Sequence, residues 1–344
     1  MRKKNILAIF LIVFTMMLSS FAFYGYQILY TPNVLIEGEA TKIAIPSGMT
    51  FGELQTQLSK ERIVNDAVSF GFLSKLKDLD KNLRPGLYLL NPDMTNLELI
   101  NLLRSGNQTP VNLTFSNARF LNQLPARLTK NLAADSTQMA TVLFSDTTAA
   151  HYGFEAHTFI SMFIPNTYQV YWTDTPNIVL DRLKREYNAF WTEERRQKAA
   201  NLDMTPIEVS TLASIVQGET NKMEEAATVA GVYINRLQSG IALQADPTLV
   251  FAIGDFTIRR ILNKDKDFES PYNTYKYRGL PPGPICMPSI AAIDAVLNYE
   301  DHNYLYFCAK EDFSGYHVFA KTLSEHNRNA RKFQRALNRQ RIYR

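Results

Sequence analysis

The sequence predicts an α+β protein that begins with a single transmembrane helix. Three observations support this fold class. The 344 residues leave room for two or three modest domains, and the hydrophobic share of 46% is enough for buried cores. One long uncharged segment stands at the N-terminus. The rest of the chain mixes short β-type runs with segments of helical periodicity.

The uncharged segment 6–30 is predicted to be a membrane anchor. Its most apolar part, residues 6–23, is 18 residues long, which is near the lower limit for crossing a bilayer core, and three tyrosines follow it. The basic residues at 2–4 place the tail 1–5 in the cytoplasm and the remainder of the chain outside. A cleaved signal peptide is the alternative, because small residues at 19–22 would permit cleavage. The apolar run continues past them, so a retained anchor is favoured.

Residues 38–107 are predicted to form a small α+β module, and residues 108–200 a connecting α+β region. In the module we expect strands at 43–50 and 86–90 and helices at 51–58, 66–77 and 94–103. In the connecting region we expect strands at 111–115 and 163–171 and helices at 121–132, 136–144 and 176–194.

The region 201–344 opens with two expected helices. Thr205 is a good N-cap with Glu208 in capping-box position, so the first helix should begin there and run to about residue 218. The second should run from about residue 221 to Gly240. Further on we expect a surface helix or loop at 258–268, a rigid loop at 272–285, a helix at 288–297, a hairpin of strands 304–309 and 317–319, and a terminal helix at 322–337.

Glu219 stands in the expected break between the two helices. The first helix would point its partly negative C-terminus at this carboxyl group, and the apolar Ile215 and Val216 precede it by one turn. Both effects disfavour the ionised form, so we expect a raised pKa and a general acid that works near neutral pH. The alternative is that Glu219 only caps the second helix, where a carboxylate is also favoured.

The segments that follow Glu219 are rich in amide, hydroxyl and aromatic groups on rigid turns. Planar hydrogen-bonding groups and flat apolar rings are what a protein needs to hold a sugar chain. A structural role in a turn or in the core is the alternative for each of these residues. The residues that we expect to line a sugar cleft are Gln244, Asp246, Asn273, Tyr275 and His317.

Together these motifs resemble those of the YceG-like family of endolytic murein transglycosylases. The resemblance rests on LASIVQGET, VYINRL, LQADPT, YNTY, GLPPGPI, HVF and HN, and it extends from the anchor to about residue 326. In that family the catalytic acid is the Glu before Thr, which implies Glu219 here. The family's usual Glu two residues earlier is replaced by Gln217, and Asn166 replaces the Asp of its F-P-D-T-Y element. Glu219 is therefore the only carboxylate of its motif.

The resemblance also implies a fold and an activity. It implies a LysM-like module at 38–107 and a YceG-like catalytic region at 201–344. The implied enzyme is a lyase that cuts the MurNAc–GlcNAc bond within nascent peptidoglycan strands, forms 1,6-anhydro-MurNAc and so limits strand elongation. Glu219 would act first as acid and then as base on the sugar's own 6-hydroxyl, with no metal or other cofactor. Cell-wall synthases are the expected partners, at the outer face of the cytoplasmic membrane.

Two other classes of function stay open. A glycan hydrolase normally needs two carboxylates, and Asp246 is the nearest candidate for the second. The alternative for Asp246 is an Asx-type turn before Pro247. A non-catalytic glycan-binding scaffold for cell-wall synthases would not depend on the acid chemistry of Glu219.

Composition argues against several further functions. The net charge is only +4, so no global positive field indicates nucleic acid. The basic segment 328–344 fits a solvated final helix with an apolar stripe better than a nucleic-acid tail. The two cysteines, Cys286 and Cys308, lack metal-site spacing and the five histidines are scattered, so no zinc site is expected. Two ordinary buried thiols are more common than a disulfide in such a case.

Overall fold

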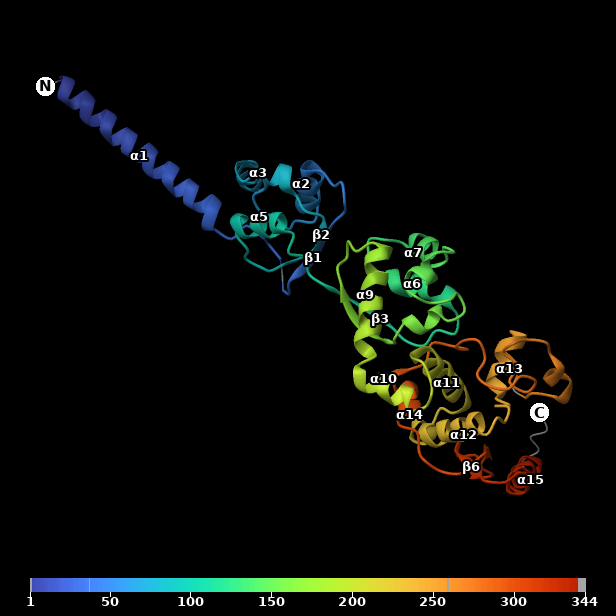
Figure 1. Cartoon of the computed structure of the whole chain (residues 1–344). Coiled ribbons are helices and arrows are strands. Elements are labelled where there is room, and N and C mark those ends of the chain that lie inside the picture. The colour runs from blue at the N-terminus through green and yellow to red at the C-terminus, as the bar shows by residue number, and fades with distance from the viewer. Residues whose placement is uncertain (1, 37, 259, 340–344) are drawn as a thin grey trace. The chain divides into compact units, whose positions relative to one another are not determined.

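The computed structural model describes residues 2–36, 38–258 and 260–339, and the chain divides into two compact units (Figure 1). Unit 1 comprises Met1–Asn112, Asn131–Ala134 and Gln169–Thr175. Unit 2 comprises Leu113–Lys130, Asp135–Tyr168 and Pro176–Arg344. The connecting region that was expected at 108–200 falls largely within unit 2.

Unit 1 is a small α+β module with a long helix before it. Its two strands pair antiparallel, with Thr41 opposite Leu90 and Ile45 opposite Gly86. Capping boxes at Thr50 and Thr95 start two of its helices. Its elements are α1 (Arg2–Tyr30), β1 (Thr41–Ile45), α2 (Phe51–Lys60), α3 (Ala67–Leu76), α4 (Leu79–Asn82), β2 (Gly86–Leu90) and α5 (Asn96–Ser105). The expected mixture of strands and helices is present, while the module's bounds at 38–107 and its likeness to LysM stay predictions.

Helix α1 is long and apolar enough to cross a membrane. Its segment Lys3–Tyr30 has a mean hydropathy of 2.5, and no part of its most apolar stretch is buried in the protein. Outside that stretch, near the end of the helix, Ile28 packs into the core of unit 1. The helix therefore enters the module only at its C-terminal end.

Unit 2 is mostly helical and surrounds α11. Strands β3 and β4 pair with each other, while β5 and β6 form an antiparallel hairpin. The strands are β3 (Val111–Phe115), β4 (Asn166–Val170), β5 (Tyr306–Ala309) and β6 (His317–Ala320). The helices are α6 (Leu124–Thr129), α7 (Ser136–Leu143), α8 (Thr148–His151), α9 (Pro176–Phe190), α10 (Glu193–Ala200), α11 (Pro206–Glu219), α12 (Ala226–Gln238), α13 (Asp246–Ile253), α14 (Ile290–Leu297) and α15 (Leu323–Arg339). Short 3₁₀ turns lie at Leu121–Gln123, Phe159–Met162, Met223–Glu225 and Asn263–Asp267.

Helix α11 is the centre of unit 2. Every residue from 209 to 216 is buried, and α12, α13 and α14 pack around it. A helix that is buried on all sides has a weak amphipathic pattern, so its ends are set by capping groups more than by periodicity. The capping box of Thr205 and Glu208 that the sequence predicts is present at its start.

Two predicted elements differ from the structure, and one helix was missed. The helix expected at 176–194 is two helices, because the Thr192 hydroxyl accepts a hydrogen bond from the Arg195 amide and starts α10. The second helix expected from 221 begins only at Ala226, after a 3₁₀ turn. Helix α13 was not expected, although Pro247 at the start of an apolar run is a helix-start signal.

Candidate active site

Glu219 is the last residue of α11 and does not lie in a break between two helices. The helix passes through Gly218, and Thr220 is its C-cap, with its amide bonded to the Val216 carbonyl. The predicted break between the two helices is present at residues 220–225, and Glu219 lies one residue before it. The reason to expect a raised pKa for Glu219 still applies, because its carboxyl group lies at the partly negative end of the helix.

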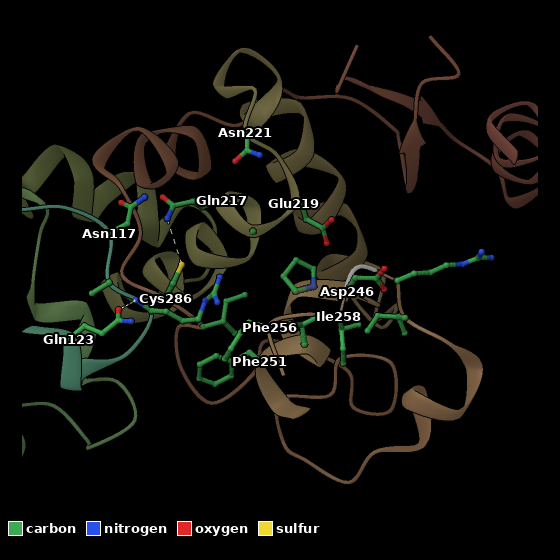
Figure 2. A pocket seen from close by; sticks show the side chains of 18 of the residues that line it. Asn117, Gln123, Gln217, Glu219, Asn221, Asp246, Phe251, Phe256, Ile258 and Cys286 are labelled. Carbon is green, nitrogen blue, oxygen red and sulfur yellow. Dashed lines mark hydrogen bonds between the residues drawn. The ribbon is translucent and has the colours of Figure 1, made fainter. Parts of the chain in front are cut away.

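Gly218 lets the end of α11 approach the start of α13. A Cβ at this position would lie 2.8 Å from Cβ and 3.0 Å from Cγ of Pro247. Real Cβ atoms almost never make such contacts, so any larger residue would push the two helices apart. The glycine thus brings Glu219 and Asp246, the first residue of α13, to the same place (Figure 2).

The Glu219 side chain is half-buried and has one strong hydrogen bond. The Tyr233 hydroxyl, from α12, donates to its Oε1 at 2.6 Å. Burial raises the pKa of Glu219 to about 7, against the hydrogen bond from Tyr233, which lowers it. The charge of Asp246 raises this pKa further and that of Arg236 lowers it. A carboxyl group with a pKa near 7 can donate and accept a proton at neutral pH.

Tyr233 is a site residue whose role the sequence did not reveal. It lies among the buried apolar positions of α12, is 2% exposed, and packs edge-on against Phe307. Burial and the carboxylates of Glu219 and Asp246 raise its pKa well above the usual value, so it stays a hydrogen-bond donor. A hydroxyl in an otherwise apolar stripe needs a polar partner. This requirement is the one signal in the sequence that could have pointed to Tyr233.

Asp246 and Tyr275 form a second pair beside Glu219. The Tyr275 hydroxyl donates to Oδ1 of Asp246 at 2.5 Å. Burial and this carboxylate both raise the pKa of Tyr275. The two tyrosine–carboxylate pairs therefore come from four different segments, α11 with α12 and α13 with the loop after it.

Two cavities meet at the two carboxylates. One has a volume of about 680 Å³ and the other about 360 Å³, and Glu219 and Asp246 line both. Aromatic side chains and arginines line much of the larger cavity, and the Arg119 guanidinium lies 4.0 Å from the centre of the Phe256 ring. Figure 2 shows Phe251 and Phe256 on the same side of this cavity, opposite Asn221. Polar walls with half-buried aromatic rings suit a sugar chain.

The smaller cavity contains two of the other predicted residues. Gln244 and Tyr275 line it, together with His326. Gln244 is exposed and adopts a left-handed backbone with φ of +51°, and its backbone N–H donates a hydrogen bond to the Thr274 carbonyl. His326 packs against the Tyr306 ring, and its buried Nδ1 has no hydrogen-bond partner among the described residues. Burial lowers the pKa of His326, which favours the neutral ring.

The structure places Asn273 and His317 away from both cavities. Asn273 is fully buried, and its Nδ2 donates to the carbonyls of Lys266 and Phe268 at 2.9 and 2.8 Å. The backbone amide and Nδ1 of His317 both contact the buried carboxylate of Glu225, at 3.0 and 2.6 Å. These contacts hold the loop and the β5–β6 hairpin in place, and neither residue lines either of the two cavities.

Glu225 also helps to hold the β5–β6 hairpin in place. Burial alone would raise its pKa, but hydrogen bonds from Thr220 and His317 outweigh burial and lower it. The Thr220 hydroxyl donates to Oε1 of Glu225 at 2.7 Å, directly after the candidate acid in the chain. The end of α11 is thereby tied to the hairpin.

The side-chain amide of Gln217 forms hydrogen bonds to the loop before α14. Its Oε1 accepts from the Ser289 amide at 2.7 Å, and its Nε2 points at the Met287 carbonyl and at Cys286 (Figure 2). Both an acceptor and a donor are needed for this bridge, and a carboxylate would supply only acceptors. At this position the chain has a structural amide between α11 and the loop before α14.

The remaining polar groups form no metal-binding cluster. Within residues 2–36, 38–258 and 260–339, no three His, Cys, Asp or Glu side chains are placed to hold a metal ion. Cys286 and Cys308 are free thiols. Burial raises the pKa of Cys286 to about 11, so this thiol is protonated at neutral pH.

A carboxyl group with a near-neutral pKa, at the junction of two polar cavities, defines a general acid–base site of the kind that cleaves glycosidic bonds. The chain belongs to the YceG-like family, whose sequence profile matches residues 43–332. This confirms the resemblance that the sequence motifs indicate. Membership makes the chain an enzyme of the lyase class.

Three known proteins illustrate the relationship. A protein of Bacillus subtilis named endolytic murein transglycosylase is 28% identical, over 85% of this chain and 84% of its own length. A protein of the same name from Streptococcus pneumoniae serotype 2 is 27% identical over 92% of this chain, which spans 63% of the pneumococcal protein. The 2.6 Å crystal structure of a YceG-like protein from Listeria monocytogenes matches with a TM-score of 0.54 and 25% identity, over 84% of this chain and 98% of that one.

Proposed function

We propose that this chain is a membrane-anchored lytic transglycosylase that cuts within peptidoglycan glycan strands. The observation that carries the proposal is the position of Glu219, where the two cavities meet. Its raised pKa leaves it a proton to donate near neutral pH. The shared name of the two bacterial relatives supports murein as the substrate.

In the proposed reaction, Glu219 donates its proton to the oxygen that links MurNAc to GlcNAc. The bond from C1 of MurNAc to that oxygen breaks, and GlcNAc leaves with a new hydroxyl. The Glu219 carboxylate then takes the proton of the MurNAc 6-hydroxyl, whose oxygen bonds to C1 and closes the 1,6-anhydro ring. Glu219 ends the cycle protonated, and no water is consumed. One positioned acid–base group contributes about 10²–10⁴-fold, and holding the internal nucleophile close to C1 contributes more.

Tyr233 and Asp246 prepare Glu219 for both steps. The Tyr233 hydroxyl holds Oε1, which leaves Oε2 for the substrate. The negative charge of Asp246 keeps the pKa of Glu219 high and suits the positive charge that develops at C1. Tyr275 holds Asp246 in this position.

The two cavities give an interior cut its geometry. A strand that is cut away from its ends must extend on both sides of the broken bond, and two cavities, of about 680 and 360 Å³, both reach the carboxylates. We assign Gln244, Tyr275 and His326 as sugar contacts in the smaller cavity. Phe251 and Phe256 are the stacking surfaces of the larger cavity.

Helix α1 gives the enzyme its place in the cell. An anchor with its N-terminus in the cytoplasm would keep the active site at the outer face of the membrane, where new strands emerge. Cutting there limits strand elongation, and cell-wall synthases are the partners that this location implies.

The test compares the full chain with its Glu219→Gln variant on purified glycan strands, by mass spectrometry of the fragments. We expect 1,6-anhydro ends from the native chain and a loss of at least about 10²-fold in cleavage for the variant. Glu224→Gln is the matched control, because Glu224 is exposed, lies five residues away and loses the same charge. This control should cut normally.

The same experiment separates the two other functions. Fragments heavier by one water, with reducing ends, would mean a hydrolase in which Asp246 activates water. A non-catalytic scaffold would give no fragments from either protein.

A further inference from the structure

Helix α3 of unit 1 has an apolar stripe that no described residue covers. Val68, Phe72 and Leu76 are 77%, 61% and 67% exposed, and they lie four residues apart, which places them on one face of the helix. The opposite face buries Phe70 and Leu73 in the core. Three large apolar side chains in a row on a small domain mark an interaction surface.

The start of α3 is joined to the end of α1 by a buried polar network. The Asn96 amide donates to the Ile28 carbonyl of α1 and to the Ser69 hydroxyl of α3, at 3.2 and 3.1 Å. Asn33 bonds both Asn96 and the backbone of Asp66, the N-cap of α3. Asn33, Ser69 and Asn96 are each at most 5% exposed. Buried and satisfied networks of this kind fix geometry, so α3 keeps its place beside the end of α1.

The end of α1 is where a membrane-crossing helix would leave the bilayer. Tyr24, Tyr26 and Tyr30 are exposed there, and tyrosines favour the headgroup level. Figure 1 shows α3 next to this end of α1, and the two helices are in contact. Lys75, the only charged residue of α3, is exposed on it and suits anionic headgroups.

We propose that α3 inserts its stripe of Val68, Phe72 and Leu76 into the surface of the same bilayer that α1 crosses. Because α3 is fixed beside the end of α1, its apolar stripe is always close to the bilayer that α1 crosses. A protein partner, by contrast, would have to be recruited. An apolar face with a flanking lysine matches a helix that lies in a membrane interface. The inference rests on the anchoring part of the proposed function, and the insertion would fix unit 1 against the membrane.

The test places a polarity-sensitive fluorophore on single cysteines of the full chain, with Cys286 and Cys308 replaced by serine. The chain is reconstituted in vesicles of phosphatidylethanolamine and phosphatidylglycerol, with and without a lipid that carries a nitroxide near its headgroup. Val68→Cys and Phe72→Cys report on the stripe, Phe14→Cys on α1, and Lys60→Cys, exposed on α2 of the same unit, on water.

We expect a blue-shifted emission and quenching by the nitroxide lipid at positions 68 and 72, and neither at 60. Emission at 68 and 72 that matches position 60, while position 14 reports lipid, would overturn the α3 proposal and leave the anchor intact. Water-like emission at 14 as well would overturn both. A blue shift at 72 without quenching would mean that protein, such as a second copy, covers the stripe.

Discussion

At the scale of single residues, opposing forces set the acidity of Glu219. Burial and the charge of Asp246 favour the protonated acid, while the hydrogen bond from Tyr233 and the charge of Arg236 favour the carboxylate. The result is a pKa of about 7, between the values that either set would produce alone. The pH dependence of the cleavage rate should therefore change when any one of the side chains that set the pKa of Glu219 is replaced.

We expect the alkaline limb of kcat/KM to fall as the pH rises through about 7, because the acid must be protonated to donate. Asp246→Asn removes a nearby negative charge, lowers the pKa of Glu219 and should move the limb to lower pH. Tyr233→Phe removes a donor to the carboxylate, raises the pKa and should move the limb to higher pH. Both should also slow the reaction, by about 10- to 100-fold for Tyr233→Phe, since a loosened acid is misplaced. Cleavage rates from about pH 5 to 9 measure the limb.

The control for this pair is again Glu224→Gln, which changes one exposed charge nearby and should leave the limb in place. The decisive result is that the alkaline limb of kcat/KM moves in opposite directions in the two variants. A general loss of folding would lower the rate of both without moving their limbs apart. Equal shifts in one direction would contradict the assignment of Glu219 as the titrating acid.

At the scale of elements, the site depends on how closely α11 and α13 approach. Gly218→Ala would place a Cβ 2.8 Å from the Pro247 ring, in the first turn of α13. Because a proline ring is part of the backbone, α13 must shift, and Asp246 with it. We expect kcat/KM to fall by about 10- to 100-fold, with a folded protein by circular dichroism.

The comparison for this prediction is Gly52→Ala in α2. A Cβ there meets nothing within 4 Å, and alanine favours a helix over glycine by about 0.5–1 kcal/mol. This variant should be slightly more stable and fully active. A fully active Gly218→Ala would show that the approach of the two helices does not position the acid.

The sequence predicts some of these elements and misses the contacts between them. Local rules are enough for the capping box of Thr205 and for the β5–β6 hairpin, because their signals lie within a few residues. They are not enough for the Tyr233 bond to Glu219, which joins residues 14 positions apart, or for the pair of Glu225 and His317, which are 92 apart. Such pairs depend on how helices pack, which periodicity does not encode.

Buried side chains explain the other differences. Asn273 is in a motif that looks like a ligand-binding loop, and only its buried contacts show that it supports the loop. His326 was noted only as part of the family motif, and its unpartnered Nδ1 beside the smaller cavity becomes visible once α15 is placed. Residue type predicts that a polar group needs a partner, but not which one it finds.

At the scale of the whole molecule, membrane topology decides whether the active site can reach its substrate. Helix α1 is long and apolar enough to cross a bilayer, and basic residues precede its apolar part. Lysine and arginine are retained on the cytoplasmic side, so the units after α1 should lie outside the cytoplasm. Glycan strands are outside as well, whereas the opposite orientation would leave the acid without a substrate.

Cysteine labelling in intact cells tests this orientation. In a chain with Cys286→Ser and Cys308→Ser, we expect Lys60→Cys to react with a membrane-impermeant maleimide, and Lys4→Cys to react only after the cells are permeabilised. The reverse pattern would contradict the proposed orientation. A chain that labels at position 60 but never at position 4, and that an alkaline wash releases from membranes, would have lost its N-terminus to a signal peptidase. Its active site would then be free to cut strands far from the membrane, and the limit on nascent strand length would need another cause.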